Sequence, residues 1–217
     1  MSVGVKICGI RSAEIMRAAV DAGADFVGLA FFAKSPRNVS VAEAAALADI
    51  ARGRATIVAL VVDADDAAID AIVRAVQPDI LQLHGSETPE RCAVIKARWA
   101  TPIMKALGVA SVADAERSLA YLAAADLILF DAKPPKGAVL PGGNGIAFDW
   151  SIIAPMTDRV PAMLSGGLTP ANVAEAIRIA QVSAVDVSSG VETEPGVKDA
   201  ALIRAFVNAA KTAHRPA

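Results

Sequence analysis

Cys8 and Asp131 are residues of this 217-residue chain whose types and positions suit chemistry. Cys8 ends the apolar run "VGVKIC", and Gly9 then breaks the pattern. On its own, such a cysteine is either a small core residue or a reactive group at the rim of a sheet. Asp131 ends the apolar run "LILFD". Burial beside such a run raises the pKa of a carboxyl group toward its protonated form, which suits an acid.

Other polar residues and glycines also follow apolar runs along the chain. They include Arg37 in "FFAKSPRNVS", then Asp63, His84 and Lys105, and the later "SGG" and "SSG". The planar guanidinium of an arginine suits a carboxylate held by two hydrogen bonds, although a lone arginine is commonly a solvated surface residue. His84 is as consistent with a buried core histidine whose hydrogen bonds are satisfied as with a residue of a ligand site. Together the polar residues have the distribution expected of a ligand site.

Three glycine-containing loops suit a phosphate group. Gly166 and Gly167 follow one apolar run, and Ser188, Ser189 and Gly190 follow the next. Glycines let the backbone approach a ligand, and free N–H groups with serine hydroxyls suit phosphate oxygens. Ordinary tight turns are the alternative, and two such loops in consecutive units favour phosphate. The long segment "DAKPPKGAVLPGGNGIAFDW" adds Gly143, Asn144 and Gly145, either as a cover that reaches the phosphate or as an unordered insertion.

The apolar runs that position these residues number eight, and most begin about 23 to 25 residues apart. Helical segments lie between them. Ser40 with Glu43 predicts a capping box, and Thr88–Pro89 and Thr169–Pro170 each predict an N-cap followed by proline. Strand and helix therefore alternate eight times, which predicts one (β/α)8 TIM barrel domain over residues 1–217. A doubly wound sheet is the rival, but no G-x-G-x-x-G follows the first run.

The composition argues against several classes of protein. A net charge of −2, a sequence pI of about 5.7 and 4% aromatic residues argue against nucleic-acid binding. No apolar run approaches the roughly 20 residues that span a bilayer, and Lys6 and Arg11 interrupt any leader-like run. The two cysteines, Cys8 and Cys92, do not make a disulfide framework, and Cys92 falls on the apolar side of a helix. We therefore expect a soluble, cytoplasmic chain without a membrane or nucleic-acid partner.

The motifs, taken in order, resemble the phosphoribosylanthranilate isomerase family of tryptophan biosynthesis. The matching stretches are "KICG", "SPR", "LQLHG", Asp131, "PGGNGIAFDW", "LSGGLTPANV" and "VDVSSGVE" with "GVKD", between residues 5 and 199. One departure is Asn144, where the family usually has threonine. This resemblance implies a (β/α)8 barrel that converts N-(5-phosphoribosyl)anthranilate to 1-(2-carboxyphenylamino)-1-deoxyribulose 5-phosphate without a metal or organic cofactor.

The resemblance also implies roles for individual residues. Cys8 is then the general base, Asp131 the general acid, and Arg37 the group that holds the anthranilate carboxylate. The substrate-binding set is His84, Gly143, Asn144, Gly145, Gly166, Gly167, Asp186, Ser188, Ser189 and Gly190, together with Arg37. Asp186 either hydrogen-bonds the substrate or supports the other groups. Whether the chain acts as a monomer or a homodimer stays open.

Three other functions remain open from the sequence. They are a related sugar-phosphate isomerase or epimerase, a bifunctional isomerase that also takes the histidine-pathway aminoaldose, and a barrel that only binds a phosphorylated ligand. With only two histidines in the chain, no convincing histidine–carboxylate metal set favours a metal-dependent epimerase. "HGSE" is a poor second phosphate site for the bifunctional reading, and the presence of both Cys8 and Asp131 argues against a purely binding protein.

Overall fold

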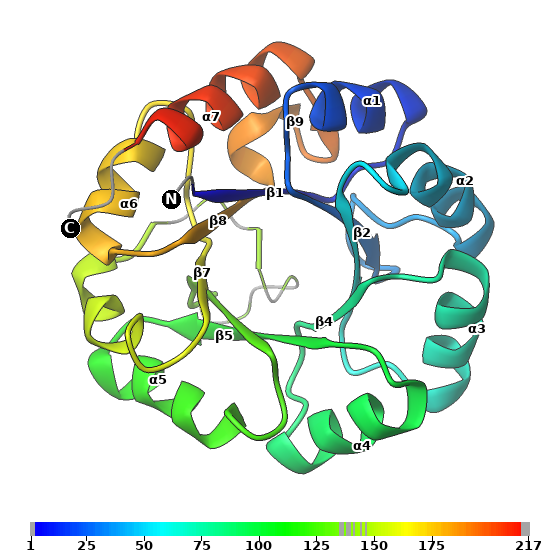
Figure 1. Cartoon of the computed structure of the whole chain (residues 1–217), viewed down its shortest axis with the longest axis horizontal. Coiled ribbons are helices and arrows are strands. Elements are labelled where there is room, and N and C mark those ends of the chain that lie inside the picture. Colours follow the sequence, from blue (N-terminus) through cyan, green and yellow to red (C-terminus); the bar gives the residue numbers. More distant parts are fainter. Residues whose placement is uncertain are drawn as a thin grey trace.

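A closed barrel of eight parallel strands forms the centre of the molecule. The computed structural model describes residues 3–134, 137, 140, 142–143, 145 and 147–213. The strands pair in sequence order and the barrel closes between β1 and β8, inside the ring of helices seen in Figure 1. The strands are β1 (Gly4–Cys8), β2 (Phe26–Phe31), β3 (Thr56–Val61), β4 (Ile80–Leu83), β5 (Ile103–Val109), β6 (Leu127–Ala132), β7 (Ala162–Leu164) and β8 (Ala184–Val187). The TIM barrel predicted from the sequence is confirmed.

Helices cover the outside of the barrel. They are α1 (Ala13–Asp21), α2 (Val41–Ala51), α3 (Asp66–Val76), α4 (Pro89–Trp99), α5 (Val112–Glu116), α6 (Val173–Ala180) and α7 (Ala200–Thr212). Ser40 and Glu43 form the predicted capping box at the start of α2. Thr88 caps α4, with Pro89 in its first turn. These two local predictions are confirmed. Each could be made from the sequence because it depends only on residues that lie close together in the chain.

The prediction of a helix start at Thr169–Pro170 is wrong. Helix α6 begins at Val173, with Asn172 at its N-cap position. The Asn172 side chain binds backward instead: its Oδ1 accepts from the Thr169 N–H at 2.7 Å, and its Nδ2 donates to the Gly167 carbonyl at 3.0 Å. These two hydrogen bonds hold the segment before α6 in turns.

The strict alternation of strand and helix is also wrong after β6. In the described residues that follow this strand, two short 3₁₀ helices replace an α-helix: η2 (Trp150–Ile152) and η3 (Ala154–Met156). Pro155 lies within η3 and supplies no N–H to extend a helix. The fifth helix is short as well, since α5 passes at once into the 3₁₀ helix η1 (Arg117–Tyr121).

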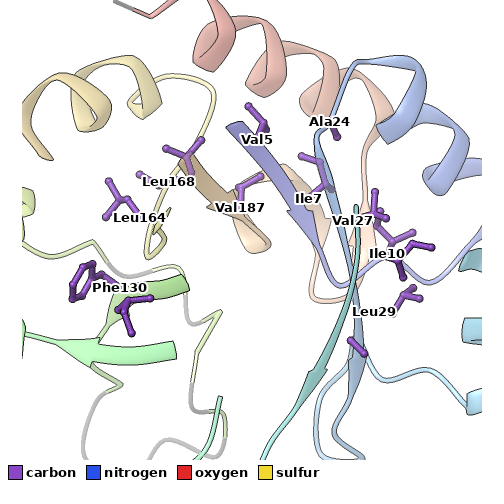
Figure 2. Close-up of a cluster of buried hydrophobic side chains, with 14 of the residues drawn as sticks. Val5, Ile7, Ile10, Ala24, Val27, Leu29, Phe130, Leu164, Leu168 and Val187 are labelled. Atoms are coloured by element: carbon purple, nitrogen blue, oxygen red, sulfur yellow. The ribbon is translucent and has the colours of Figure 1, made fainter. Parts of the chain in front are cut away.

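Each strand presents alternate residues to the two sides of the barrel wall. Val5 and Ile7 of β1, with Val27 and Leu29 of β2, belong to the main core between strands and helices, part of which Figure 2 shows. A second, smaller core cluster consists of Met104, Ala106, Leu129 and Met163, from β5, β6 and β7. Lys6 and Cys8 alternate with Val5 and Ile7, so their side chains point into the barrel.

A hairpin follows β8 before the last helix. The 3₁₀ helix η4 (Ser189–Val191) leads into β9 (Glu192–Glu194), which pairs antiparallel with β10 (Val197–Lys198). This hairpin, which the sequence reading did not predict, brings Glu192 and Lys198 to the end of the barrel where β8 finishes. Among the described residues, none of the helices has the length and apolar character needed to cross a bilayer.

Candidate active site

A pocket lies at the carboxyl ends of the strands and contains most of the predicted site residues. Its lining includes Cys8, Arg37, His84, Asp131, Gly143, Gly145, Gly166, Gly167, Asp186, Ser188 and Ser189. Gly190 lies beside this lining rather than in it. Asn144 lies outside the described residues. Six different strands, or the loops that follow them, therefore direct polar groups to one place, as expected for the active end of a TIM barrel.

Cys8 lies next to a buried ion pair where β1 pairs with β8. The Lys6 Nζ is 2.8 Å from the Asp186 Oδ1, and the Asp186 Oδ2 accepts from the Ser165 hydroxyl at 3.0 Å. Burial raises the pKa of the Cys8 thiol, Lys6 lowers it and Asp186 raises it, with a net upward shift. Burial lowers the pKa of Lys6, but the charges of Asp186 and Cys8 and the hydrogen bonds to both together outweigh this, so the net pKa is raised. Lys6 therefore stays a cation beside the thiol.

Asp131 faces His84 from the other side of the pocket. The His84 Nε2 lies 3.3 Å from the Asp131 Oδ2, and the Asp131 Oδ1 accepts from the Ala132 N–H at 2.8 Å. The Gln82 Nε2 lies 3.0 Å from the His84 Nδ1, which must accept because an amide nitrogen only donates. The His84 Nε2 then carries the hydrogen and faces the Asp131 carboxylate as a close polar contact.

The amide of Gln82 allows a second arrangement of the same groups. The buried Gln82 Oε1 has no hydrogen-bond partner among the described residues, so turning the amide would place this oxygen opposite the His84 Nδ1. The histidine would then carry its hydrogen on Nδ1, and its Nε2 could accept from a protonated Asp131. The three side chains can thus serve both the ionised and the protonated form of the aspartic acid.

Arg37 is only 7% exposed and is not a solvated surface residue. Its Nε and Nη2 each donate to Glu192 at 2.8 Å, and Nη2 also reaches the Gly143 carbonyl at 3.4 Å. Lys198 donates to the same glutamate at 3.0 Å. Burial raises the pKa of Glu192, but the two cations outweigh this and the net pKa is lowered. Glu192 thus orients the guanidinium, and among the described residues Nη1 has no hydrogen-bond partner.

The loops after β7 and β8 meet through their backbones. Gly166 and Gly167 have φ values of +87° and +65°, which only glycine adopts without strain. A Cβ on Gly190 would overlap the Leu168 carbonyl oxygen. The Ser188 hydroxyl donates to the Cys8 carbonyl at 3.1 Å, which ties this loop to β1. The two loops therefore lie against each other, and residues of both line the pocket.

Two of the polar residues that follow apolar runs do not line the pocket. Lys105 lies on the outer side of the barrel wall, where its Nζ donates to the Gly85 carbonyl at 2.7 Å and to Glu87 at 2.8 Å. The Asp63 carboxylate accepts from Ser86. Strand alternation explains Lys105, because Ala106 and Met104 take the inward positions. Cys92 is fully buried in the core, as predicted.

The sequence reading missed Lys6, Gln82, Ser165, Glu192 and Lys198. Lys6 and Gln82 stand two positions before Cys8 and His84, so strand alternation puts each pair on one face. A charged or amide residue inside an apolar strand was the signal available for both. Glu192 and Lys198 needed the hairpin fold, which no local pattern indicated. In the part of the chain that the structure describes, no cluster of three histidine, cysteine or carboxylate residues could hold a metal ion.

Comparison with known proteins gives a consistent result. Residues 5–209 match the family model for N-(5'-phosphoribosyl)anthranilate (PRA) isomerase. The N-(5'-phosphoribosyl)anthranilate isomerase of Paramagnetospirillum magneticum is 56% identical over 97% of this chain and 98% of its own. The crystal structure of phosphoribosyl anthranilate isomerase from Thermotoga maritima superposes with a TM-score of 0.87 at 40% identity, covering 96% of this chain and 98% of that one.

A second solved structure contains a ligand. It is a phosphoribosyl anthranilate isomerase in complex with reduced 1-(o-carboxyphenylamino)-1-deoxyribulose 5-phosphate. It is 38% identical to this chain, with a TM-score of 0.84, and the match covers 96% of this chain and 98% of that one.

Proposed function

The chain belongs to the N-(5'-phosphoribosyl)anthranilate isomerase family, and from this premise we propose that Cys8 and Asp131 are the base and the acid of its reaction. The enzyme is an aldose–ketose isomerase of tryptophan biosynthesis. It performs an Amadori rearrangement of N-(5-phosphoribosyl)anthranilate to 1-(2-carboxyphenylamino)-1-deoxyribulose 5-phosphate.

The reaction needs two proton transfers on opposite sides of the sugar. An acid protonates the ring oxygen as the furanose opens to an iminium ion, and a base then removes the proton from C2 to give an enolamine. The enolamine tautomerises to the ketone. Asp131 delivers the first proton, and the Cys8 thiolate accepts the second, which the adjacent iminium has already made acidic.

One observation carries the proposal: Cys8 and Asp131 line the same pocket from strands that are not neighbours. β1 and β6 are separated by β7 and β8 on one side of the barrel. A sugar held between them could therefore meet the acid on one face and the base on the other. The alternative arrangements of Gln82 and His84 support the acid role, since Asp131 has a partner both before and after it gives up its proton.

The remaining predicted residues hold the two ends of the substrate. The free Nη1 edge of Arg37 takes the anthranilate carboxylate, and His84 lines the pocket near the reacting groups. The loops with Gly166–Gly167 and Ser188–Gly190, with Gly145 beside Ser189, take the phosphate, and Gly143 lies beside Arg37 at the carboxylate end. Binding energy from the phosphate fixes the sugar between Cys8 and Asp131. Asp186 acts as support, because Lys6 and Ser165 engage its two oxygens.

We further propose a single domain over residues 1–217 that works in the cytoplasm, as a monomer or homodimer, without a nucleic-acid partner. One chain supplies all the described groups of the pocket, so the site needs no residue from a second copy.

The proposal is tested by replacing Cys8 with serine. Serine nearly preserves size but will not supply an anionic base near neutral pH, so we expect kcat to fall by about 10²- to 10⁴-fold with a smaller change in KM. Turnover is followed by the loss of anthranilate fluorescence. Cys92→Ser, in the core, is the matched control and should keep kcat. A folded Cys8→Ser variant with near-parent turnover would remove Cys8 from the mechanism.

A further inference from the structure

We propose that Lys6 is a positioning residue that favours the thiolate form of Cys8 and that Asp186 limits this effect. The inference rests on the proposed function, in which Cys8 is the base. Lys6 is fully buried and does not line the pocket, so it has no route to the substrate except through its neighbours. The proposal gives this buried cation a part in the reaction.

The Lys6 ammonium and the Cys8 thiol both lie against Gly28 of the neighbouring strand β2. Lys6 and Cys8 project from one face of β1, with Gly28 of β2 paired to Cys8. A Cβ on Gly28 would lie 2.8 Å from the Cys8 Sγ and 3.2 Å from the Lys6 Nζ. Any residue larger than glycine would therefore push into both groups. Both side chains are buried, so the cation acts on the thiol with little screening by solvent.

Asp186 has two opposing effects on the cysteine. Its Oδ1 holds the Lys6 Nζ at 2.8 Å, which fixes the cation beside β1. Its negative charge also disfavours a second anion close by, and burial disfavours the thiolate further. Burial and Asp186 therefore keep the resting thiol from full ionisation, against the effect of Lys6. Lys6 and Asp186 should shift the titration of Cys8 in opposite directions.

The other charged groups that face Cys8 are already paired. Arg37, from the loop after β2, and Lys198, from β10, both bind Glu192. Lys198 lowers the pKa of the thiol less than Lys6 does. Lys6 is thus the main cation that acts on Cys8, and its partner Asp186 is the main anion.

The test compares three variants in a Cys92→Ala background, so that Cys8 is the remaining thiol. Thiolate formation is followed by its ultraviolet absorbance as the pH is raised, without substrate, against a Cys8→Ala/Cys92→Ala blank. We expect Lys6→Met to raise the apparent pKa of Cys8 by roughly 1–3 units, as for loss of an adjacent opposite charge. Asp186→Asn keeps the hydrogen-bonding shape and should lower it, because the Cys8 thiolate is then the counter-charge that the buried Lys6 ammonium has left. The acidic limb of the kcat/KM profile should move with each.

Lys105→Met is the matched control. Lys105 is also a buried lysine, with its carboxylate partner Glu87 at 2.8 Å, but it lies on the outer side of the wall. Its loss should disturb folding to a similar degree and leave the Cys8 titration unchanged. If Lys6→Met fails to fold, Asp186→Asn still tests the proposal. A purely structural role for the Lys6–Asp186 pair predicts no downward shift in the pKa of Cys8.

Two results would overturn the inference. The first is a Cys8 titration in Lys6→Met that matches the parent or Lys105→Met. The second is a shifted titration without a matching shift in kcat/KM, since Lys6 would then act on a thiol that the reaction does not use. Failure of the proposed function is seen separately, as normal turnover in Cys8→Ser.

Discussion

Replacing Glu192 with glutamine should destabilise the enzyme by about 3–5 kcal/mol, as expected for breaking a buried ion pair from one side. Glu192 accepts four hydrogen bonds: from the Arg37 Nε at 2.8 Å, the Arg37 Nη2 at 2.8 Å, the Lys198 Nζ at 3.0 Å and the Gly196 N–H at 3.2 Å. The amide oxygen can keep two of these. The amide NH₂ would face two other donors, and two buried cations would lose their counter-charge.

The assay is urea unfolding followed by tryptophan fluorescence, with a thermal scan beside it. For a chain of this size, the loss corresponds to a fall in Tm of about 6–20 °C. Glu194→Gln, exposed on the same strand β9, is the control and should stay within about 0.5 kcal/mol of the parent.

The pH dependence supplies a second check. The pKa of Glu192 is lowered in the folded enzyme, so its contribution is present above its unfolded pKa and is lost as pH falls through its folded pKa. The gap between parent and Glu192→Gln should therefore close in acid. A variant within about 1 kcal/mol of the parent at neutral pH, or a gap that widens on acidification, would refute the reasoning.

Three further results are expected. Gly190→Ala should raise KM by roughly tenfold, or about 1.4 kcal/mol, because its methyl group would overlap the Leu168 carbonyl and push apart the two loops that we propose hold the phosphate. An unchanged KM in steady-state kinetics would contradict this. Asp131→Asn should lower kcat by about 10²- to 10⁴-fold, and a near-normal kcat would exclude Asp131 as the acid. The kcat/KM of the parent should keep rising with pH above neutrality, because the pKa of Cys8 is raised and its thiolate is the proposed base; a plateau reached in mild acid would speak against that proposal.

Local patterns explain why most of the fold could be predicted. The apolar runs are long enough to define strands, and the caps at Ser40 and Thr88 involve neighbours in the chain. One of the errors occurs where a side chain has competing hydrogen-bond partners nearby in the chain. Asn172 hydrogen-bonds to Thr169 and Gly167, which precede it in the chain, and α6 therefore begins after Asn172. The helix-start propensity of Thr169–Pro170 does not indicate these hydrogen bonds.

The candidate site divides in the same way. Residues that follow an apolar run, such as Cys8 and Asp131, could be found by reading strand ends alone. Lys105 shows the limit of that reading, because its place within β5 turns it away from the pocket. Glu192 and Lys198 could not be found, since their meeting with Arg37 depends on a hairpin and on contacts between residues 155 positions apart. Such contacts follow from the closed barrel and not from any short stretch of sequence.

The pairing of β1 with β8 also has a kinetic consequence. Lys6 and Asp186 are 180 positions apart, so their ion pair forms only after the chain has closed one of its longest loops. Contacts between residues so far apart in sequence form slowly, because the chain loses the entropy of loop closure before it gains the free energy of the contact. During synthesis, β1 emerges before β8. Until β8 pairs with it, its lysine and cysteine, which are buried in the finished barrel, stay exposed. The surroundings of Cys8 are therefore complete only in the closed barrel, and recovery of activity on refolding should follow closure of the ring more closely than it follows the appearance of helices.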